Sequence, residues 1–248
     1  MCVLEGPDLV EAALDSAVEF EALYVDAAAT THPATSETVA RATKVGVRVF
    51  ALASGVLEKI AEASTPQPLL AAVRFAITPV TAIDVQGLIL VLHDVRDPGN
   101  AGTIIRSADA AGASAVVLTG QSVDPFNPKT LRATAGSIFH LPVAVSSFDE
   151  ALQHFVAAGA RTFATVVRGG EDHRRVDFTK ASVMVIGNEA DGLDAQTVTK
   201  CQASVSIAMA GRNESLNAGV AASLVAFEAL WQRQDANGAP PPPSLTGT

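Results

Sequence analysis

The sequence of 248 residues has few cysteines, few aromatic residues and no cluster of positive charge. Cys2 and Cys201 provide neither a disulfide framework nor the spacing of metal ligands, so we expect a reducing, cytoplasmic setting and no metal site. The formal net charge is −9, and no run is rich in Lys or Arg. This balance disfavours nonspecific duplex DNA and anionic membranes as partners, because both are held by bulk positive charge. A nucleic-acid enzyme with a local basic groove stays compatible with it.

Long apolar runs and the commonest catalytic motifs are also missing. No apolar run reaches the roughly 18 residues of a membrane span, and the N-terminus does not resemble a signal peptide. The sequence contains no G-x-G-x-x-G, G-x-x-x-x-G-K-S/T, H-E-x-x-H or G-x-S-x-G pattern. Dinucleotide binding, P-loop chemistry, zinc proteolysis and hydrolase-fold catalysis therefore lack their usual signatures.

The composition that is present is that of a folded chain. Apolar residues make up 48% and charged residues 17%, which allows a sizeable core. The pattern divides the chain into a small α/β domain over residues 1–78, a linker over 79–86, a larger domain over 87–235 and a tail over 236–248. The tail, ANGAPPPPSLTGT, cannot bury a core and is predicted to be disordered.

Strands and helices alternate in both domains, which predicts sheets covered by helices. In the first domain the predicted helices span 7–17, 36–43 and 56–63, and the predicted strands 22–25, 45–52 and 69–77. In the second, the predicted helices span 101–111, 129–136 and 150–158, and the strands 87–93, 115–118, 138–145, 162–167, 182–186 and 205–208. A last helix places Leu216, Val220, Leu224, Phe227 and Trp231 on one face. Continuous apolar strands between helices predict a mostly parallel sheet.

Ligands of open α/β sheets bind beyond the carboxyl ends of the strands, and three strand ends here carry unusual residues. The first is HDVRDPGNAGTIIRSADAAGA, residues 93–113, where Asn100 opens a helix. Arg106 lies nearly two turns further along and can share a helix face with Asn100. Taken alone, the pair also fits an ordinary cap and a surface arginine.

The second strand end is VMVIGNEADGL, residues 183–193, where a buried strand runs directly into Gly187, Asn188 and Glu189. A glycine there lets a ligand or another backbone segment approach closely. The ordinary alternative is a helix N-terminus, at which the macrodipole favours Glu189.

The third strand end is VSIAMAGRNESLNAGVAASLVAFEALW, residues 205–231. Ser215 and Asn217 lie where a small, polar loop meets an Ala-rich helix. The ordinary alternative is that Asn213 or Ser215 simply caps this helix.

Together, these segments resemble the three signature motifs of the SpoU (TrmH-like) ribose 2′-O-methyltransferases of the SPOUT superfamily. Motif one is matched by NAGTIIRSA (100–108), motif two by GNEADGL (187–193) and motif three by IAMAGRNESLN (207–217). The segment KTLRATAGSIFHLPV (129–143) is similar to the one that these enzymes carry between motifs one and two. The opening VLEGPDLVEAA (3–13) resembles the start of the L30e-like RNA-binding domain that precedes the catalytic domain in many members.

The resemblance implies an α/β fold whose mostly parallel sheet ends in a C-terminal trefoil knot, with a small L30e-like α/β domain before it. It also implies a homodimer with the active site at the subunit interface. The implied reaction transfers a methyl group from S-adenosylmethionine to a ribose 2′-hydroxyl of RNA, with 23S ribosomal RNA as the expected substrate. The expected partners are RNA and a second copy of the chain, with no membrane and no metal.

The family assigns central roles to the residues that match Arg106, Asn100, Glu189, Ser215 and Asn217. Because a guanidinium stays charged, we expect Arg106 to clamp an RNA phosphate and stabilise the developing oxyanion rather than accept a proton. Glu189 would orient that arginine, and Asn100 would hold the ribose or the arginine. Ser215 and Asn217 would order the motif-three loop and position the nucleotide.

The resemblance further implies a cofactor pocket formed by the knot loops. The residues expected to line it are Gly187, Asn188, Ile207, Met209, Leu216, Thr165 and Val166. Gly187 would make room for the cofactor, and the apolar members would contact adenine. Candidate RNA contacts are Arg41, Lys44, Lys129, Arg132 and Arg168, which are expected to converge on one groove with the acidic residues on the far side.

Two other functions remain open at this point. One is the same chemistry on transfer RNA, against which the L30e-like opening argues only by analogy. The other is a catalytically silent homologue that binds RNA or the ribosome, and the intact Arg106, Glu189, Ser215 and Asn217 argue against it.

Overall fold

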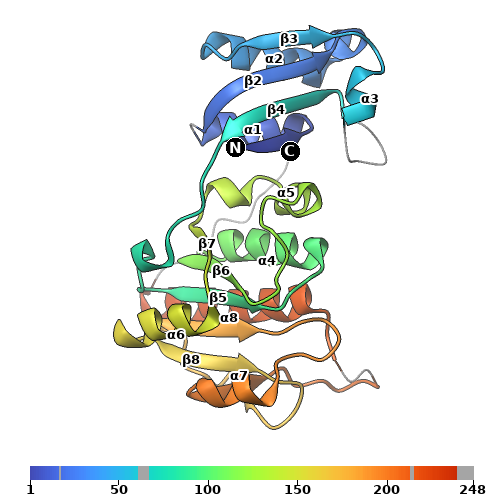
Figure 1. The fold of residues 1–248 in the computed structure, drawn as a ribbon. Coiled ribbons are helices and arrows are strands. Elements are labelled where there is room, and N and C mark those ends of the chain that lie inside the picture. Colours follow the sequence, from blue (N-terminus) through green and yellow to red (C-terminus); the bar gives the residue numbers. More distant parts are fainter. Residues whose placement is uncertain (17, 61–66, 213–214, 239–248) are drawn as a thin grey trace.

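The computed structural model describes residues 1–16, 18–60, 67–212 and 215–238, which form two β-sheets one after the other along the chain (Figure 1). The first sheet has four strands in the order β1-β4-β2-β3, and the second has seven in the order β7-β6-β5-β10-β8-β11-β9. Every strand pair of the larger sheet is parallel, which confirms the predicted α/β fold with a mostly parallel sheet. In the described ranges, no helix is long and apolar enough to cross a membrane.

The small sheet is mixed, with β4 antiparallel to β1 and β2, and β3 parallel to β2. Its elements are β1 (Cys2–Glu5), α1 (Pro7–Asp15), β2 (Glu19–Asp26), the 3₁₀ turn η1 (Ala27–Thr31), α2 (Pro33–Lys44), β3 (Val49–Leu52), α3 (Val56–Ile60) and β4 (Leu69–Arg74). The sequence pattern predicts neither β1 nor η1. The strand predicted over 45–52 begins only at Val49, because Val45 caps α2 and Gly46 adopts a φ of 85°. The last residue of the first predicted helix and residues 61–63 of the third lie outside the described residues.

The larger sheet alternates with helices over the rest of the described chain. Its elements are η2 (Val80–Ala82), β5 (Leu88–His93), α4 (Pro98–Ala110), β6 (Ala115–Thr119), α5 (Pro128–Thr134), η3 (Ser137–Phe139), β7 (Val143–Val145), α6 (Phe148–Ala157), β8 (Arg161–Thr165), β9 (Glu171–Asp172), β10 (Ser182–Ile186), α7 (Ala195–Lys200), β11 (Ala203–Ser206) and α8 (Ala218–Ala236). α7 and β9 are too short and too polar for the periodicity to predict.

Both faces of this sheet are buried, as the continuous apolar strands predict. Leu88, Leu90 and Leu92 of β5 belong to the core that contains α4 and α8, whereas Ile89 and Val91 belong to the core under α6. β10 lies between β5 and β8, while α8 returns to pack against α4 (Figure 1). β11 lies on one side of β10 and α8 packs on the other. The chain therefore passes across β10 on its way from β11 to α8.

Of three segments predicted to be extended or irregular, only the extended stretch over 138–145 is contradicted by the structure. The extended stretch predicted over 138–145 contains η3 and only three strand residues, because Ala135 and Gly136 both adopt left-handed conformations. The segment predicted as a linker, 79–86, contains η2 and buries Val80 and Ile83 against the core. Of the tail predicted over 236–248, residue 236 ends α8, and 239–248 lie outside the described residues.

Candidate active site

A cavity of about 300 Å³ opens at the carboxyl ends of β8, β10 and β11, in the size range of small-molecule sites. The residues that line it are Thr165, Val166, Val167, Ile186, Gly187, Asn188, Glu189, Ala190, Asp191, Gly192, Val205, Ile207, Met209, Ser215, Leu216, Ala218, Ala221 and Val225. All seven residues expected to line a cofactor pocket are among them, together with Glu189 and Ser215.

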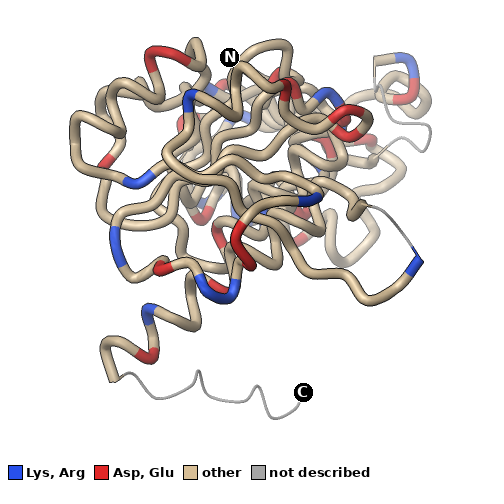
Figure 2. The backbone as a smooth tube through the Cα atoms, turned by 90° about the horizontal axis from the view of Figure 1, so that it is seen from below, with Lys and Arg blue, Asp and Glu red and all other residues tan. Residues whose placement is uncertain are grey.

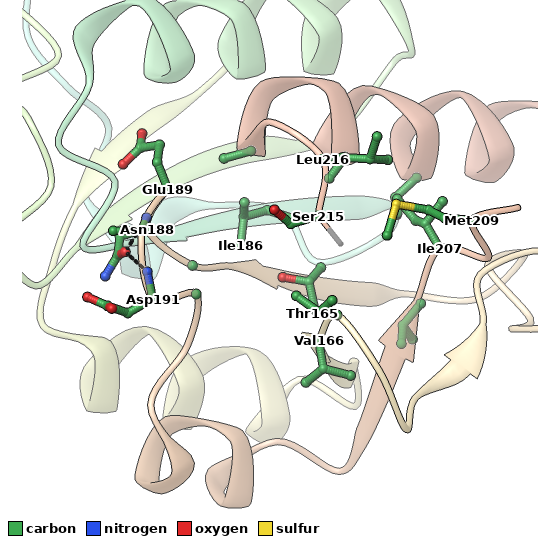
Figure 3. Close-up of a pocket in the computed structure, with 18 residues that line it drawn as sticks. Thr165, Val166, Ile186, Asn188, Glu189, Asp191, Ile207, Met209, Ser215 and Leu216 are labelled. Atoms are coloured by element: carbon green, nitrogen blue, oxygen red, sulfur yellow. Dashed lines mark hydrogen bonds between the residues drawn. The ribbon is translucent and has the colours of Figure 1, made fainter. Parts of the chain in front are cut away.

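The cavity is polar at one end and apolar at the other. Figure 3 shows Asn188, Glu189 and Asp191 together at one end, with Met209 and Ile207 at the opposite end. The side chains of Met209 and Leu216 are more than one third exposed, so they offer apolar surface that a ligand can cover. An acidic end beside an apolar end suits a ligand that joins a cationic group to a flat, apolar ring system.

A chain of hydrogen bonds connects all three motifs. Asn100 of α4 donates from Nδ2 to Glu189 Oε1 at 2.8 Å and accepts at Oδ1 from Asn217 Nδ2 at 2.8 Å. Asn217 Oδ1 in turn accepts from the backbone N–H of Val220, in the first turn of α8. Because Asn100 is only 9% exposed, the amide is shielded from competing water and its orientation is determined by these two partners.

The structure contradicts the ordinary alternatives for Asn100, Glu189 and Ser215, but it agrees with the surface position that the ordinary alternative gives Arg106. The cap of α4 is Asp97, whose side chain accepts from the backbone N–H of Asn100. No helix begins at Glu189, since α7 starts after Asp194. The cap of α8 is Asn217 rather than Ser215, and Asn213 lies outside the described residues.

Motif two forms a tight loop held by its own backbone. Asn188 Oδ1 accepts from the N–H groups of Ala190 and Asp191, and Gly192 donates its N–H to the carbonyl of Asn188. A Cβ at Gly187 would lie 2.3 Å from the carbonyl carbon of Gly192. A glycine is therefore required here because another backbone segment approaches closely. Of the two explanations that the sequence allows, a nearby ligand or a nearby backbone, the structure shows the nearby backbone.

Arg106 lies on the exposed surface of α4, outside the cavity lining and the hydrogen-bond chain. Within the described ranges it forms no hydrogen bond or ion pair, so Glu189 holds Asn100 and not the arginine, contrary to expectation. Thr103, one turn earlier on the same helix, lies beside Gly219 of α8. Arg106 is therefore a solvent-facing cation next to the start of α8.

The candidate RNA contacts do not form one group. Arg41 is paired with Asp15 and lies near Glu11, and Arg132 Nη1 is 2.6 Å from Glu5 Oε2, so both guanidinium groups are already neutralised by carboxylates. Lys44, Lys129 and Arg168 are exposed. Figure 2 shows Lys and Arg interspersed with Asp and Glu along the described chain, rather than separated onto two sides.

Several lining residues were not predicted from the sequence. Ala218, Ala221 and Val225 of α8 line the cavity, as do Val205 of β11 and Ile186 at the end of β10. The small residues Ala218 and Ala221 could have indicated this part of the lining, because residues three or four positions apart lie on the same face of a helix. In the described ranges, no group of three or more His, Cys, Asp or Glu side chains could hold a metal ion.

Comparison with known families gives one match for each sheet. The family described as the SpoU rRNA Methylase family matches residues 87–227. The domain described as an MRM3-like substrate binding domain matches residues 1–71.

Named relatives match over most of the chain. A 23S rRNA (guanosine(2553)-2′-O)-methyltransferase of Bacillus subtilis is 33% identical over 226 residues, covering 91% of this chain and 86% of the relative. A 23S rRNA (uridine(2479)-2′-O)-methyltransferase of Streptomyces viridochromogenes is 37% identical over 193 residues, covering 74% of this chain and 67% of the relative.

Solved structures agree with these relatives. The SpoU methyltransferase AviRb of Streptomyces viridochromogenes in complex with AdoMet has a TM-score of 0.83 at 30% identity, covering 93% of this chain and 89% of that one. An AdoMet-bound rRNA methyltransferase of Sinorhizobium meliloti has a TM-score of 0.80 at 35% identity, covering 92% and 86%.

Proposed function

Because the chain belongs to the SpoU rRNA methylase family, we propose that it transfers a methyl group from S-adenosylmethionine to a ribose 2′-hydroxyl of RNA, with ribosomal RNA as the substrate. The observation that carries this proposal is the hydrogen-bond chain Glu189–Asn100–Asn217, which joins the three motifs beside the cavity. The two relatives named as 23S rRNA methyltransferases favour ribosomal over transfer RNA as the substrate. Ribosomal RNA would be met in the cytoplasm, where we propose that the chain acts.

The cavity fits S-adenosylmethionine, which supplies an electrophilic methyl group when bound. Its apolar end, with Ile207, Met209 and Leu216, suits adenine, and its acidic end suits the cationic part of the donor. Thr165 contributes its carbon atoms to the wall, since its hydroxyl donates to the carbonyl of Val185. Gly187 and Asn188 shape the pocket through the motif-two loop, and Val166 lines its lower edge.

Arg106 is the residue that we assign to the RNA. As an exposed guanidinium without a carboxylate partner in the described chain, it can bind a phosphate and stabilise negative charge that develops on the ribose oxygen. It is unsuited to accept the hydroxyl proton, because a guanidinium stays protonated. Asn100 and Glu189 position the site rather than contact the substrate. The Glu189 carboxylate orients the Asn100 amide, and this amide orients Asn217 at the start of α8. Ser215, in the cavity wall, is assigned to positioning the nucleotide.

The remaining RNA contacts are assigned to the exposed cations Lys44, Lys129 and Arg168. Arg41 and Arg132, which the sequence also suggests, pair with Asp15 and Glu5. The small sheet of residues 1–78 would bind the substrate, the segment 79–86 would connect the sheets, and 87–235 would carry the reaction. The match to a substrate binding domain over residues 1–71 supports this division.

A homodimer is part of the proposal. Val220, Leu224 and Trp231 are exposed on α8 at spacings of four and seven, with the half-buried Phe227 between them. Such an apolar stripe is unusual on a monomer's surface and suits a helix of a second copy. Since Arg106 lies beside the start of this helix, the partner's cavity could receive it. We also propose that the crossing of β10 between β11 and α8 is the trefoil knot of this superfamily.

The test is transfer of a labelled methyl group to ribosomal and transfer RNA, followed by mapping of the modified ribose. We expect one 2′-O-methylated nucleotide in ribosomal RNA. Arg106→Ala should lower the rate by roughly a hundredfold or more, while S-adenosylhomocysteine still binds in calorimetry. Methylation of transfer RNA alone would show that transfer RNA, and not ribosomal RNA, is the substrate. Tight RNA binding without cofactor uptake would mean a silent homologue, and undiminished methylation by Arg106→Ala would remove the role assigned to the arginine.

A further inference from the structure

The two sheets are joined by a buried ion pair. Glu5, at the end of β1, has a side chain that is 4% exposed, and its carboxylate receives Arg132 Nη1 from α5 at 2.6 Å. A charge that is buried this deeply costs free energy unless its partner stays in place. The pair therefore favours one particular placement of the small sheet on α5.

Close packing around the pair restricts the same junction. A Cβ on Gly136, just after α5, would lie 2.3 Å from Cβ of Ala12 on α1, so the two units approach at the limit of contact. Phe75, after β4, packs edge-on against the rings of Phe126 and Phe139 at 6.0 and 5.1 Å. One continuous apolar core contains residues from both units.

The connecting segment is also held down. The backbone N–H of Thr78 donates to the carbonyl of Val143 at 2.8 Å, and Val80 and Ile83 are buried against the larger sheet. The ion pair, the aromatic contacts and the connecting segment therefore restrain the junction between the two units at three separate points.

The junction leads directly to the helix that carries motif one. Ala133, next to Arg132, lies so close to Gly102 of α4 that a Cβ there would come within 2.4 Å of the alanine Cβ. Gly102 is two residues from Asn100 and four from Arg106. The small sheet is therefore braced through α5 against the helix that presents the proposed reactive arginine.

We infer that the Glu5–Arg132 pair is a positioning element that determines which nucleotide of a bound RNA reaches the active site. This rests on the proposed function. With the small unit holding RNA at one place and α4 presenting Arg106 at another, the fixed junction sets the span between the recognised feature and the methylated ribose. Arg132, which the sequence pattern suggests as an RNA contact, acts here through Glu5 rather than on the substrate.

The experiment is a double-mutant cycle with Glu5→Ala, Arg132→Ala and the combined variant. Asp149→Asn is the control, because it breaks the exposed pair with Lys200 inside the larger unit. Each variant is assayed for KM and kcat on ribosomal RNA, for the position of the methyl group, for the salt dependence of RNA binding and for affinity to S-adenosylhomocysteine.

We expect each single variant to raise KM for RNA roughly tenfold or more, and to spread methylation to neighbouring nucleotides. kcat and S-adenosylhomocysteine affinity should stay within about twofold, and the combined variant should be no worse than the poorer single one. The salt slope should not change. The milder Glu5→Gln, which keeps an acceptor oxygen for Arg132, should shift KM less and covers the case in which Glu5→Ala fails to fold.

Three results would overturn the inference. The first is that the effects of the two substitutions on KM add up and that the salt dependence of RNA binding falls by about one only when Arg132 is replaced. This result would make Arg132 a direct phosphate contact. Values equal to those of Asp149→Asn would deny the pair any positioning role. If the unaltered chain methylates no RNA, the proposed function fails, and small-angle X-ray scattering still tests the junction: we expect a larger radius of gyration in Glu5→Ala, and an unchanged one refutes the restraint.

Discussion

Asn100 and Asn217 are 117 positions apart in the sequence, yet their side-chain amides share a hydrogen bond of 2.8 Å. The same Asn100 amide donates to Glu189, so one buried side chain joins all three motifs. The side-chain amide makes this possible because its nitrogen donates to the carboxylate while its oxygen accepts from the second amide.

Replacing Asn100 should therefore damage both stability and activity. Asn100→Ala leaves Glu189 and Asn217 without this partner and should lower the free energy of unfolding by about 1–3 kcal/mol. Asn100→Asp sets two carboxylates against each other, which raises the pKa of the pair. Its stability should fall as the pH rises above about 4, while that of Asn100→Ala shows no such trend. Thermal unfolding between pH 4 and 8 measures this, and parallel pH profiles of the two variants would contradict it.

Gly187→Ala should destabilise the protein because of the backbone of Gly192 and Leu193. The added Cβ would lie 2.3 and 2.5 Å from their atoms, so the motif-two loop must move. We expect a loss of roughly 1–3 kcal/mol in chemical denaturation and weaker binding of S-adenosylhomocysteine. Gly211→Ala is the matched control, since no described residue has an atom within 4 Å of its Cβ position, and its stability should stay within about 0.5 kcal/mol. Equal losses in both variants would refute the steric explanation.

Charge on the α8 stripe should dissociate the proposed homodimer. Leu224→Glu puts a carboxylate in the middle of the exposed apolar row, and burying it in an interface is costly. Light scattering after gel filtration should give a dimer for the unaltered chain and a monomer for the variant, with methylation lost in the monomer. Trp231 is the sole tryptophan, so its emission should shift to longer wavelength on dissociation. If the Leu224→Glu variant stays dimeric, the exposed row on α8 is not the dimer interface.

Acid should weaken the cap of α7. The backbone N–H of Thr197, and then its hydroxyl, hold the pKa of Asp194 below its ordinary value. A carboxyl with a lowered folded pKa stabilises the fold above its unfolded pKa, near 4, and loses this contribution as the pH falls through the folded value. Asp194→Ala should therefore lower Tm at pH 7, and the difference from the unaltered chain should shrink below about pH 4. Asp194→Asn, which can still cap, should retain most of the pH 7 stability. A Tm difference that is constant with pH would assign the effect to packing instead.

The sequence by itself determined the alternation of strands and helices, the parallel sheet and the three polar strand ends. The reason is that these features are local: apolar runs such as 182–186 are buried on both faces, and a strand followed by Gly187 and Asn188 must end in a turn. Parallel strands bring their carboxyl ends to one edge, which explains why the strand ends meet, whereas the expectation that Ile207, Met209 and Leu216 line the cavity came from the resemblance of the motifs.

Only the tertiary structure decided how individual polar groups are used. Glu189 bonds to Asn100 instead of Arg106, and Arg132 pairs with Glu5 instead of facing solvent, because each partner comes from a segment far away in the sequence. A charged residue in a sequence does not show whether water or another side chain will solvate it, and the packing of distant elements decides this. For this chain, the approach of α4 to α8 and of β1 to α5 made that selection.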